Sequence, residues 1–256
     1  MSRSENPTVT IAPGVEMPLL GFGTWMATGD DARRALDAGY RHIDTATFYR
    51  NEDQIGRALR DSGLPRAEVF ITTKLPQGNA GRERETIEAS LEALGLDQVD
   101  LWLIHWPPGG RARPDVWQRF AEIAEAGLTR AIGVSNYDLA QVDEITEATG
   151  VPPAVDQIPW SPSLFDPEVA DGLRTRGVTL EGYSPFKTAN ANDPVLTEIA
   201  RRHGATTHQV ILRWHIDHGF VVIPKSSNPE RIVSNFDVFG FELTADELAR
   251  IDGLGG

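Results

Sequence analysis

The chain has 256 residues, and its 37 acidic residues against 24 Lys and Arg give a formal net charge of −13. This length, with 40% hydrophobic residues, is typical of a folded globular protein and excludes disordered and fibrous classes. The acidic balance argues against nonspecific nucleic-acid binding, and the lack of cysteine excludes disulfides, thiol nucleophiles and thiolate metal sites.

The first 18 residues, MSRSENPTVTIAPGVEMP, contain no apolar run like that of a signal peptide, and no later segment has the length of a membrane span. We therefore expect a cytoplasmic protein that contacts no membrane. No linker or low-complexity tract divides the sequence, so we expect one domain over residues 1–256. Nothing in the sequence demands a partner chain, which favours a monomer.

The first predicted element is a β-hairpin over residues 8–18, with its turn at Pro13-Gly14. Short apolar or β-branched runs then predict eight strands. They lie at 19–24, 41–44, 69–74, 100–105, 130–135, 154–158, 178–183 and 220–224. The first three amphipathic stretches between them each end in glycine, and a fourth looks like an extra helix outside the repeat. These predicted helices cover 84–95, 115–127, 138–150 and 206–219. Eight alternating units of this size predict an α/β fold, a (β/α)8 TIM barrel, with a doubly wound open sheet as the alternative.

Polar residues end the predicted strands, where the loops of a barrel converge on one mouth. They are Asp44, Lys74, His105, Ser135, Gln157, Tyr183 and Lys225. Ionisable residues at the ends of three successive strands are costly to bury unless they are paired. The spacing therefore predicts a shared polar site.

Within that site we expect Asp44, Tyr49, Lys74 and His105 to carry the chemistry. Tyr49 could donate a proton if the ammonium of Lys74 lowers its pKa, with Asp44 holding Lys74 and His105 polarising a carbonyl oxygen. Each residue alone has an ordinary structural interpretation, such as a turn cap or a packed core side chain. Their combination at one barrel face favours the functional one.

A second candidate site is the segment IPKSSNPERIVSN at 223–235. Asn228 suits an N-cap and Pro229 the first helical position, which predicts a helix start there. Lys225, Ser226, Ser227 and Arg231 surround that helix N-terminus and form a candidate anion site. The alternative is a solvated, well-capped helix with a surface lysine.

Three other signals are weaker. GFGTWM at 21–26 lacks the third glycine of a dinucleotide fingerprint. His208, His215 and His218 share one helical face, and we expect a polar surface and no metal site there. Lys187 is one of only three lysines, which suggests a need for an ammonium, and chance is the alternative explanation.

Taken together, the motifs closely resemble those of the aldo-keto reductases, and most resemble the bacterial 2,5-diketo-D-gluconate reductase type. The resemblance spans nearly the whole chain, in order. It is carried by GFGTW (21–25), GYRHIDTATFYRNEDQIGRAL (39–59), ITTKL (71–75), LIHWP (103–107), IGVSNY (132–137), DQI (156–158), GYSPF (182–186) and IPKSSNPERIVSN (223–235).

The resemblance implies NADPH-dependent reduction of small aldehydes and ketones, including dicarbonyls and keto-sugars. It assigns the catalytic tetrad to Asp44, Tyr49, Lys74 and His105. Cofactor-binding positions are Gly23, Thr24, Trp25, Asp44, Ser135, Asn136, Gln157, Tyr183, Ser184, Pro185, Phe186, Lys225, Ser226, Ser227, Arg231 and Asn235. The resemblance also implies a substrate pocket formed by Trp25, Phe48, Tyr49, His105 and Trp106. Trp160 either joins that rim or packs in the core.

Two other functions remain open at this point. A barrel of this family could serve as an NADPH-binding sensor or regulatory subunit with little turnover. An unrelated phosphate-binding barrel, such as an isomerase or lyase, would bind small sugar phosphates at Lys225 and show no preference for NADPH.

Overall fold

The computed structural model describes residues 6–255 and begins with the expected hairpin. Strands β1 (Thr8–Ala12) and β2 (Val15–Pro18) pair antiparallel. Gly14 in the turn has φ of +72°, a left-handed conformation that glycine adopts without steric cost.

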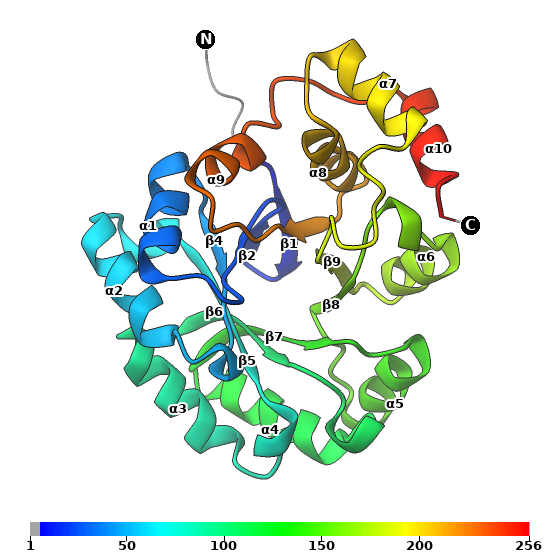
Figure 1. The fold of residues 1–256 in the computed structure, drawn as a ribbon. Coiled ribbons are helices and arrows are strands. Elements are labelled where there is room, and N and C mark those ends of the chain that lie inside the picture. The colour runs from blue at the N-terminus through cyan, green and yellow to red at the C-terminus, as the bar shows by residue number, and fades with distance from the viewer. Residues whose placement is uncertain (1–5, 256) are drawn as a thin grey trace.

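Eight parallel strands follow, and neighbours along the chain are neighbours in the sheet (Figure 1). They are β3 (Phe22–Gly23), β4 (His42–Asp44), β5 (Phe70–Leu75), β6 (Val99–Ile104), β7 (Thr129–Ser135), β8 (Val155–Pro159), β9 (Thr179–Tyr183) and β10 (Val221–Ile223). A parallel bridge between Leu20 and Val222 joins the first of these strands to the last, together with a hydrogen bond from Gly23 N to Pro224 O. The predicted eight-stranded barrel is therefore confirmed, and the open sheet is excluded.

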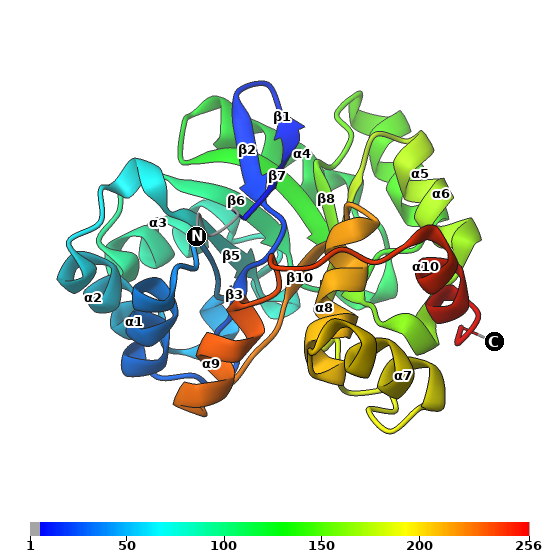
Figure 2. The ribbon, with the colours of Figure 1, turned by 90° about the horizontal axis from the view of Figure 1, so that it is seen from above.

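Helices surround the barrel on its outside (Figures 1 and 2). They are α1 (Gly29–Ala38), α2 (Glu52–Ser62), α3 (Glu83–Leu94), α4 (Pro114–Glu125), α5 (Leu139–Thr149), α6 (Pro167–Thr175), α7 (Pro194–His203), α8 (Thr207–Asp217), α9 (Pro229–Phe236) and α10 (Ala245–Asp252). Short 3-10 turns are η1 (Thr47–Tyr49), η2 (Arg66–Glu68), η3 (Gln77–Asn79), η4 (Pro108–Gly110) and η5 (Pro162–Leu164).

The two helices between β9 and β10 correct one expectation. The stretch 206–219 forms α8, but α8 packs directly against β10 and its residues 210–216 are all buried. It is therefore the barrel's own covering helix, and the extra helix is α7, which packs against α8 and α10. The expected polar surface of His208, His215 and His218 is also wrong in part, because His215 is fully buried and contacts Trp214.

Local sequence signals set the helix ends. Gly95 and Gly150 end α3 and α5 in the left-handed conformation, as predicted. The helix α4 instead ends at Ala126, one residue before the predicted glycine. Asn228 caps α9 by accepting a hydrogen bond from the backbone N–H of Arg231.

Large aromatic side chains fill the space between strands and helices. Trp102 on β6 stacks on Phe120 of α4 with ring centroids 3.8 Å apart, and both are fully buried.

Across residues 6–255, we find no helix of the length and apolar character needed to cross a membrane. The same residues contain no cluster of three metal-ligating side chains.

Candidate active site

A cavity of about 880 Å³ opens where the parallel strands end. Such a volume lies in the upper range of small-molecule sites. Its walls come from loops after most of the strands. The lining residues are Gly23, Trp25, Asp44, Phe48, Tyr49, Pro76, Gln77, Gly78, His105, Trp106, Ser135, Asn136, Gln157, Tyr183, Ser184, Pro185, Phe186, Lys187, Ile223 and Lys225.

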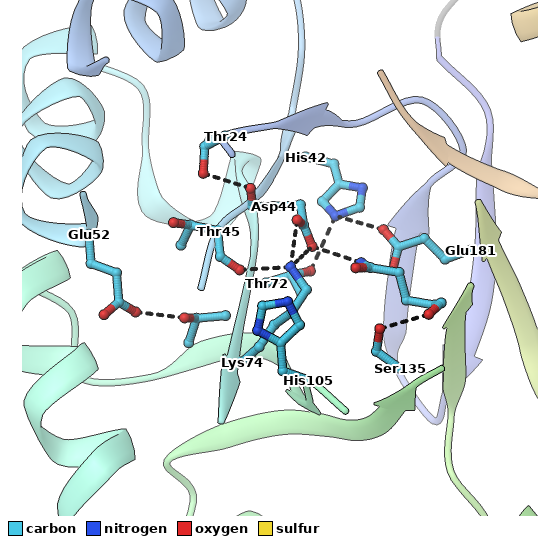
Figure 3. A network of polar contacts seen from close by, with 12 residues as sticks. Thr24, His42, Asp44, Thr45, Glu52, Thr72, Lys74, His105, Ser135 and Glu181 are labelled. Carbon is cyan, nitrogen blue, oxygen red and sulfur yellow. Dashed lines mark hydrogen bonds and ion pairs between the residues drawn. The ribbon is translucent and has the colours of Figure 1, made fainter. Parts of the chain in front are cut away.

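A buried ion pair forms the floor of this cavity (Figure 3). The Nζ atom of Lys74 lies 2.6 Å and 2.7 Å from the two carboxylate oxygens of Asp44, and it also donates to the carbonyl oxygen of Thr45. The side-chain amide of Gln157 donates to Asp44 at 2.8 Å. Burial lowers the pKa of Lys74, but Asp44 and Tyr49 more than offset that effect and its pKa is raised. Lys74 is therefore a fixed positive charge.

Tyr49 lies above this pair, on the short turn η1. The Nζ atom of Lys74 is 5.2 Å from the centroid of its ring, and the rings of Trp25 and His105 meet it edge-on. Burial raises the pKa of Tyr49, and the lowering effect of Lys74 does not outweigh it. The expected lowering of this pKa is therefore wrong for the cofactor-free site, although Lys74 acts in the direction predicted.

His105 is half-buried beside Tyr49, with the two ring centroids 5.6 Å apart. Burial, with the charge of Lys74, lowers the pKa of His105 to about 3. The imidazole is therefore neutral at physiological pH and can donate or accept a hydrogen bond without carrying charge.

Aromatic side chains stand at the mouth of the cavity. Trp25, Phe48 and Trp106 are 47%, 58% and 48% exposed, and Trp25 stacks on Phe48 with 6° between their planes. Trp160 does not join them, because it is buried and packs edge-on against Phe165 and Phe220. Of its two interpretations, core packing is the correct one.

The facing wall carries hydrogen-bonding groups on β7, β8 and β9. The hydroxyl of Tyr183 donates to Asn136 Oδ1 at 2.8 Å, and Asn136 Nδ2 donates to the carbonyl oxygen of His105. Asn136 and Ser184 have φ of +64° and +55°. Such left-handed conformations are strained for residues other than glycine and concentrate at functional sites.

The remaining end of the cavity leads to the start of α9. Lys225 lines it, is exposed, and donates to the hydroxyl of Ser227 at 2.8 Å. Arg231 lies exposed on α9, whereas Ser226 and Asn235 are buried. Thr24 is also buried, with its hydroxyl on the carbonyl oxygen of Asp44. The cavity wall itself does not include Thr24, Ser226, Ser227, Arg231 or Asn235.

Comparison with known proteins agrees with this geometry. Residues 19–255 match the Aldo/keto reductase family. The chain belongs to this family. It is 44% identical to an aldo-keto reductase of Mycolicibacterium smegmatis, covering 97% of this chain and 94% of that one. It is 40% identical to a glyoxal reductase of Bacillus subtilis, covering 99% and 95%. A Bombyx mori aldo-keto reductase solved in complex with NADP superposes with a TM-score of 0.92, at 31% identity, covering 98% and 94%. This chain is therefore an oxidoreductase.

In this aldo/keto reductase, the sequence prediction missed several cavity residues. Pro76, Gln77 and Gly78 follow the strand that carries Lys74, and their place in a loop at the barrel mouth could have indicated them. Lys187 also lines the cavity. Glu181 was missed too, although a glutamate inside an apolar strand run is a visible signal.

Proposed function

We propose that this aldo/keto reductase uses NADPH to reduce small aldehydes and ketones, above all dicarbonyl compounds, and that Tyr49 is the proton donor. Support for the substrate class comes from the glyoxal reductase among its relatives and from the exposed aromatic rim of Trp25, Phe48 and Trp106. Aromatic walls with few converging polar groups suit small carbonyl compounds. Keto-sugars of the 2,5-diketo-D-gluconate type remain candidate substrates on the resemblance of the motifs.

The residues present fit the cofactor. Gly23 has no side chain beside Ile223 O and the Cβ of Lys225, which lie 3.0 Å and 3.7 Å from where a Cβ would stand. The absence of a side chain therefore lets β3 lie close to the end of β10, which brings Lys225 to the cavity wall beside Gly23. Among the described residues, Lys225 has a hydroxyl partner and no carboxylate partner, so its charge is available to a phosphate.

The proposed cofactor contacts extend along the cavity and beyond it to the start of α9. Ser135, Asn136 and Gln157 would hold the carboxamide, and the half-buried ring of Tyr183 would stack on the nicotinamide. Lys225, Ser226 and Arg231 would hold the adenosine 2′-phosphate, beside the α9 N-terminus. Bound there, NADPH supplies the hydride that reduces the carbonyl carbon.

The side chains of the protein supply the proton and stabilise the charge that its transfer leaves behind. The hydroxyl of Tyr49 donates to the carbonyl oxygen, and the resulting phenolate is stabilised by the ammonium of Lys74. Asp44 holds that ammonium in place through its two short contacts. The neutral imidazole of His105 orients the carbonyl oxygen by a hydrogen bond.

The observation that carries this proposal is the position of Tyr49 on the cavity wall, between the buried Lys74 and the ring of His105. The experiment is NADPH consumption by the purified protein with glyoxal, methylglyoxal, simple aldehydes and keto-sugars. Turnover of dicarbonyls supports the proposal and ranks the substrates. Tight NADPH binding without turnover on any of them contradicts it and favours the sensor barrel.

A further inference from the structure

A second carboxyl group, that of Glu181, lies buried beneath the ion pair. Glu181 is the middle residue of β9, and its neighbours in the sheet are Gln157 on β8 and Val221 on β10. Its side chain points into the barrel beside Asp44, Lys74 and His42 (Figure 3). Its exposed fraction is 0%.

The two buried carboxyl groups have opposite surroundings. Asp44 receives the ammonium of Lys74 on both oxygens and the amide of Gln157 on one of them. Neither oxygen of Glu181 forms a hydrogen bond of normal length and angle within residues 6–255, and the nearby amide of Gln157, which donates to Asp44, only partly offsets the effect of burial. A carboxylate without donors in a buried site carries a large desolvation penalty, whereas a protonated carboxyl carries a much smaller one. Of the two groups, Asp44 is therefore suited to the negative charge.

Among residues 6–255, no group near Glu181 offers it a free counter-charge. His42 on β4 is its nearest basic neighbour, with Nε2 at 3.7 Å from Oε1. Burial lowers the pKa of His42 to about 3, so this imidazole is neutral. Lys74 on β5 is already bound to Asp44 and to the carbonyl of Thr45. Val221, its β10 neighbour, does not titrate.

We propose that Glu181 is protonated and neutral at neutral pH, and that it acts as a positioning residue by leaving Lys74 with Asp44 as its single counter-charge. The effect of the Lys74 charge on Tyr49 is then reduced by Asp44 alone and not by a second carboxylate. The first part of this inference concerns the protein alone, and the effect on Tyr49 rests on the proposed function.

Ionisation of Glu181 would weaken the site. Burial, with the negative charge of Asp44, raises the pKa of Glu181 to about 8. Above that pH a second carboxylate faces Lys74, and its charge raises the pKa of Tyr49 further. Tyr49 then becomes a poorer proton donor, so the rate of reduction falls as pH rises through about 8.

Infrared spectroscopy of the protein without cofactor tests the protonation directly. A protonated carboxylic acid has a carbonyl stretch that an ionised carboxylate lacks. At pH 6 we expect Glu181→Gln to remove one such band. The matched control is Glu83→Gln, because Glu83 is also buried but receives the backbone N–H of Gly81 and a contact from Arg119. An unchanged acid band in Glu181→Gln at pH 6 overturns the inference.

Thermal unfolding provides a second readout that does not depend on activity. The folded pKa of Glu181 lies above its unfolded value near 4.3, so between about pH 4 and 8 the unfolded chain releases this proton while the folded protein keeps it, and the wild type becomes less stable as pH rises. The Tm of Glu181→Gln minus that of the wild type should therefore increase as pH rises over this range. A constant Tm difference contradicts the inference.

If Glu181→Gln does not fold, a single variant of another buried acid keeps the test decisive. Asp156 is a second buried carboxyl whose pKa burial raises to about 8, and one of its oxygens lacks a partner. In Asp156→Asn, the infrared acid band that remains at pH 6 should disappear near pH 8. Absence of that band at pH 6 overturns the inference.

The pH profile of carbonyl reduction then tests the link to Tyr49. We expect the fall in kcat that the wild type shows near pH 8 to be absent in Glu181→Gln. An unmoved profile, in an enzyme that turns over, overturns the positioning role while the proposed function stands. Lack of turnover in the wild type counts against the proposed function and hence against the positioning role, and the infrared band still decides the protonation.

Discussion

Lys74 and Asp44 form a two-contact ion pair, with Nζ at 2.6 Å and 2.7 Å from the carboxylate oxygens and neither side chain accessible to solvent. The pair bridges β4 and β5, two neighbouring strands of the barrel. Burying one of these charges without the other is far more costly than burying both. The proposed proton donor thus lies above a charge that the fold itself holds in place.

Removing one member of this pair should destabilise the protein strongly. We expect Asp44→Asn or Lys74→Met alone to lower the free energy of unfolding by about 3–5 kcal/mol, because a buried charge is left without its partner. The double variant should lose clearly less than the sum of the two. Urea unfolding of all four proteins measures this coupling, and strict additivity would mean that the two charges do not interact.

Acid should unfold this protein through its buried histidines. Burial lowers the pKa of His42 and His105 to about 3 and that of His215 to about 4, all below the unfolded value near 6.5. The unfolded chain therefore takes up protons first, and the contribution of these histidines to stability falls as pH drops from about 6.5 to 4. Each histidine contributes up to about 1.4 kcal/mol per pH unit. Glu181 and Asp156, whose pKa values are raised, act in the opposite direction over this range. Urea unfolding of the wild type and of His215→Gln at pH 7, 6, 5 and 4 separates the two effects, and the same slope in both proteins would refute the expectation.

The carbonyl reductase proposal makes Lys225 the residue that distinguishes NADPH from NADH. Lys225→Ala should weaken NADPH binding by about 10- to 100-fold, the value of one charge-assisted hydrogen bond, and leave NADH nearly unchanged. Fluorescence titration with both nucleotides measures the ratio. Lys187→Ala is a matched control, because Lys187 is the other exposed lysine of the cavity wall and should not discriminate between them. Equal weakening of both nucleotides by Lys225→Ala would contradict the 2′-phosphate assignment.

The sequence alone predicts the barrel and much of the cavity wall, for a physical reason. Parallel strands repeat about every thirty residues, so Asp44, Lys74 and His105 at successive strand ends must meet at one face. Helix ends were predicted where a glycine or an Asn-Pro pair sets the local backbone, as at Gly95 and Asn228.

Burial is what the sequence could not supply. The pKa of Tyr49 depends on the balance between desolvation and Lys74, and only the packed structure shows that desolvation is larger. The same holds for His215 and Trp160, whose residue types suit a surface as well as a core. The position of Glu181 in an apolar strand run was visible in the sequence, but its unpartnered oxygens are a property of the packed interior.

Comparison of the wild type with Tyr49→Phe tests the central claim most directly. Both proteins are titrated with NADPH, and NADPH consumption is then followed with a small dicarbonyl. We expect Tyr49→Phe to bind NADPH as tightly as the wild type and to lose about 10²- to 10⁴-fold in kcat, the usual contribution of a positioned proton donor. Turnover by Tyr49→Phe at the wild-type rate would contradict it.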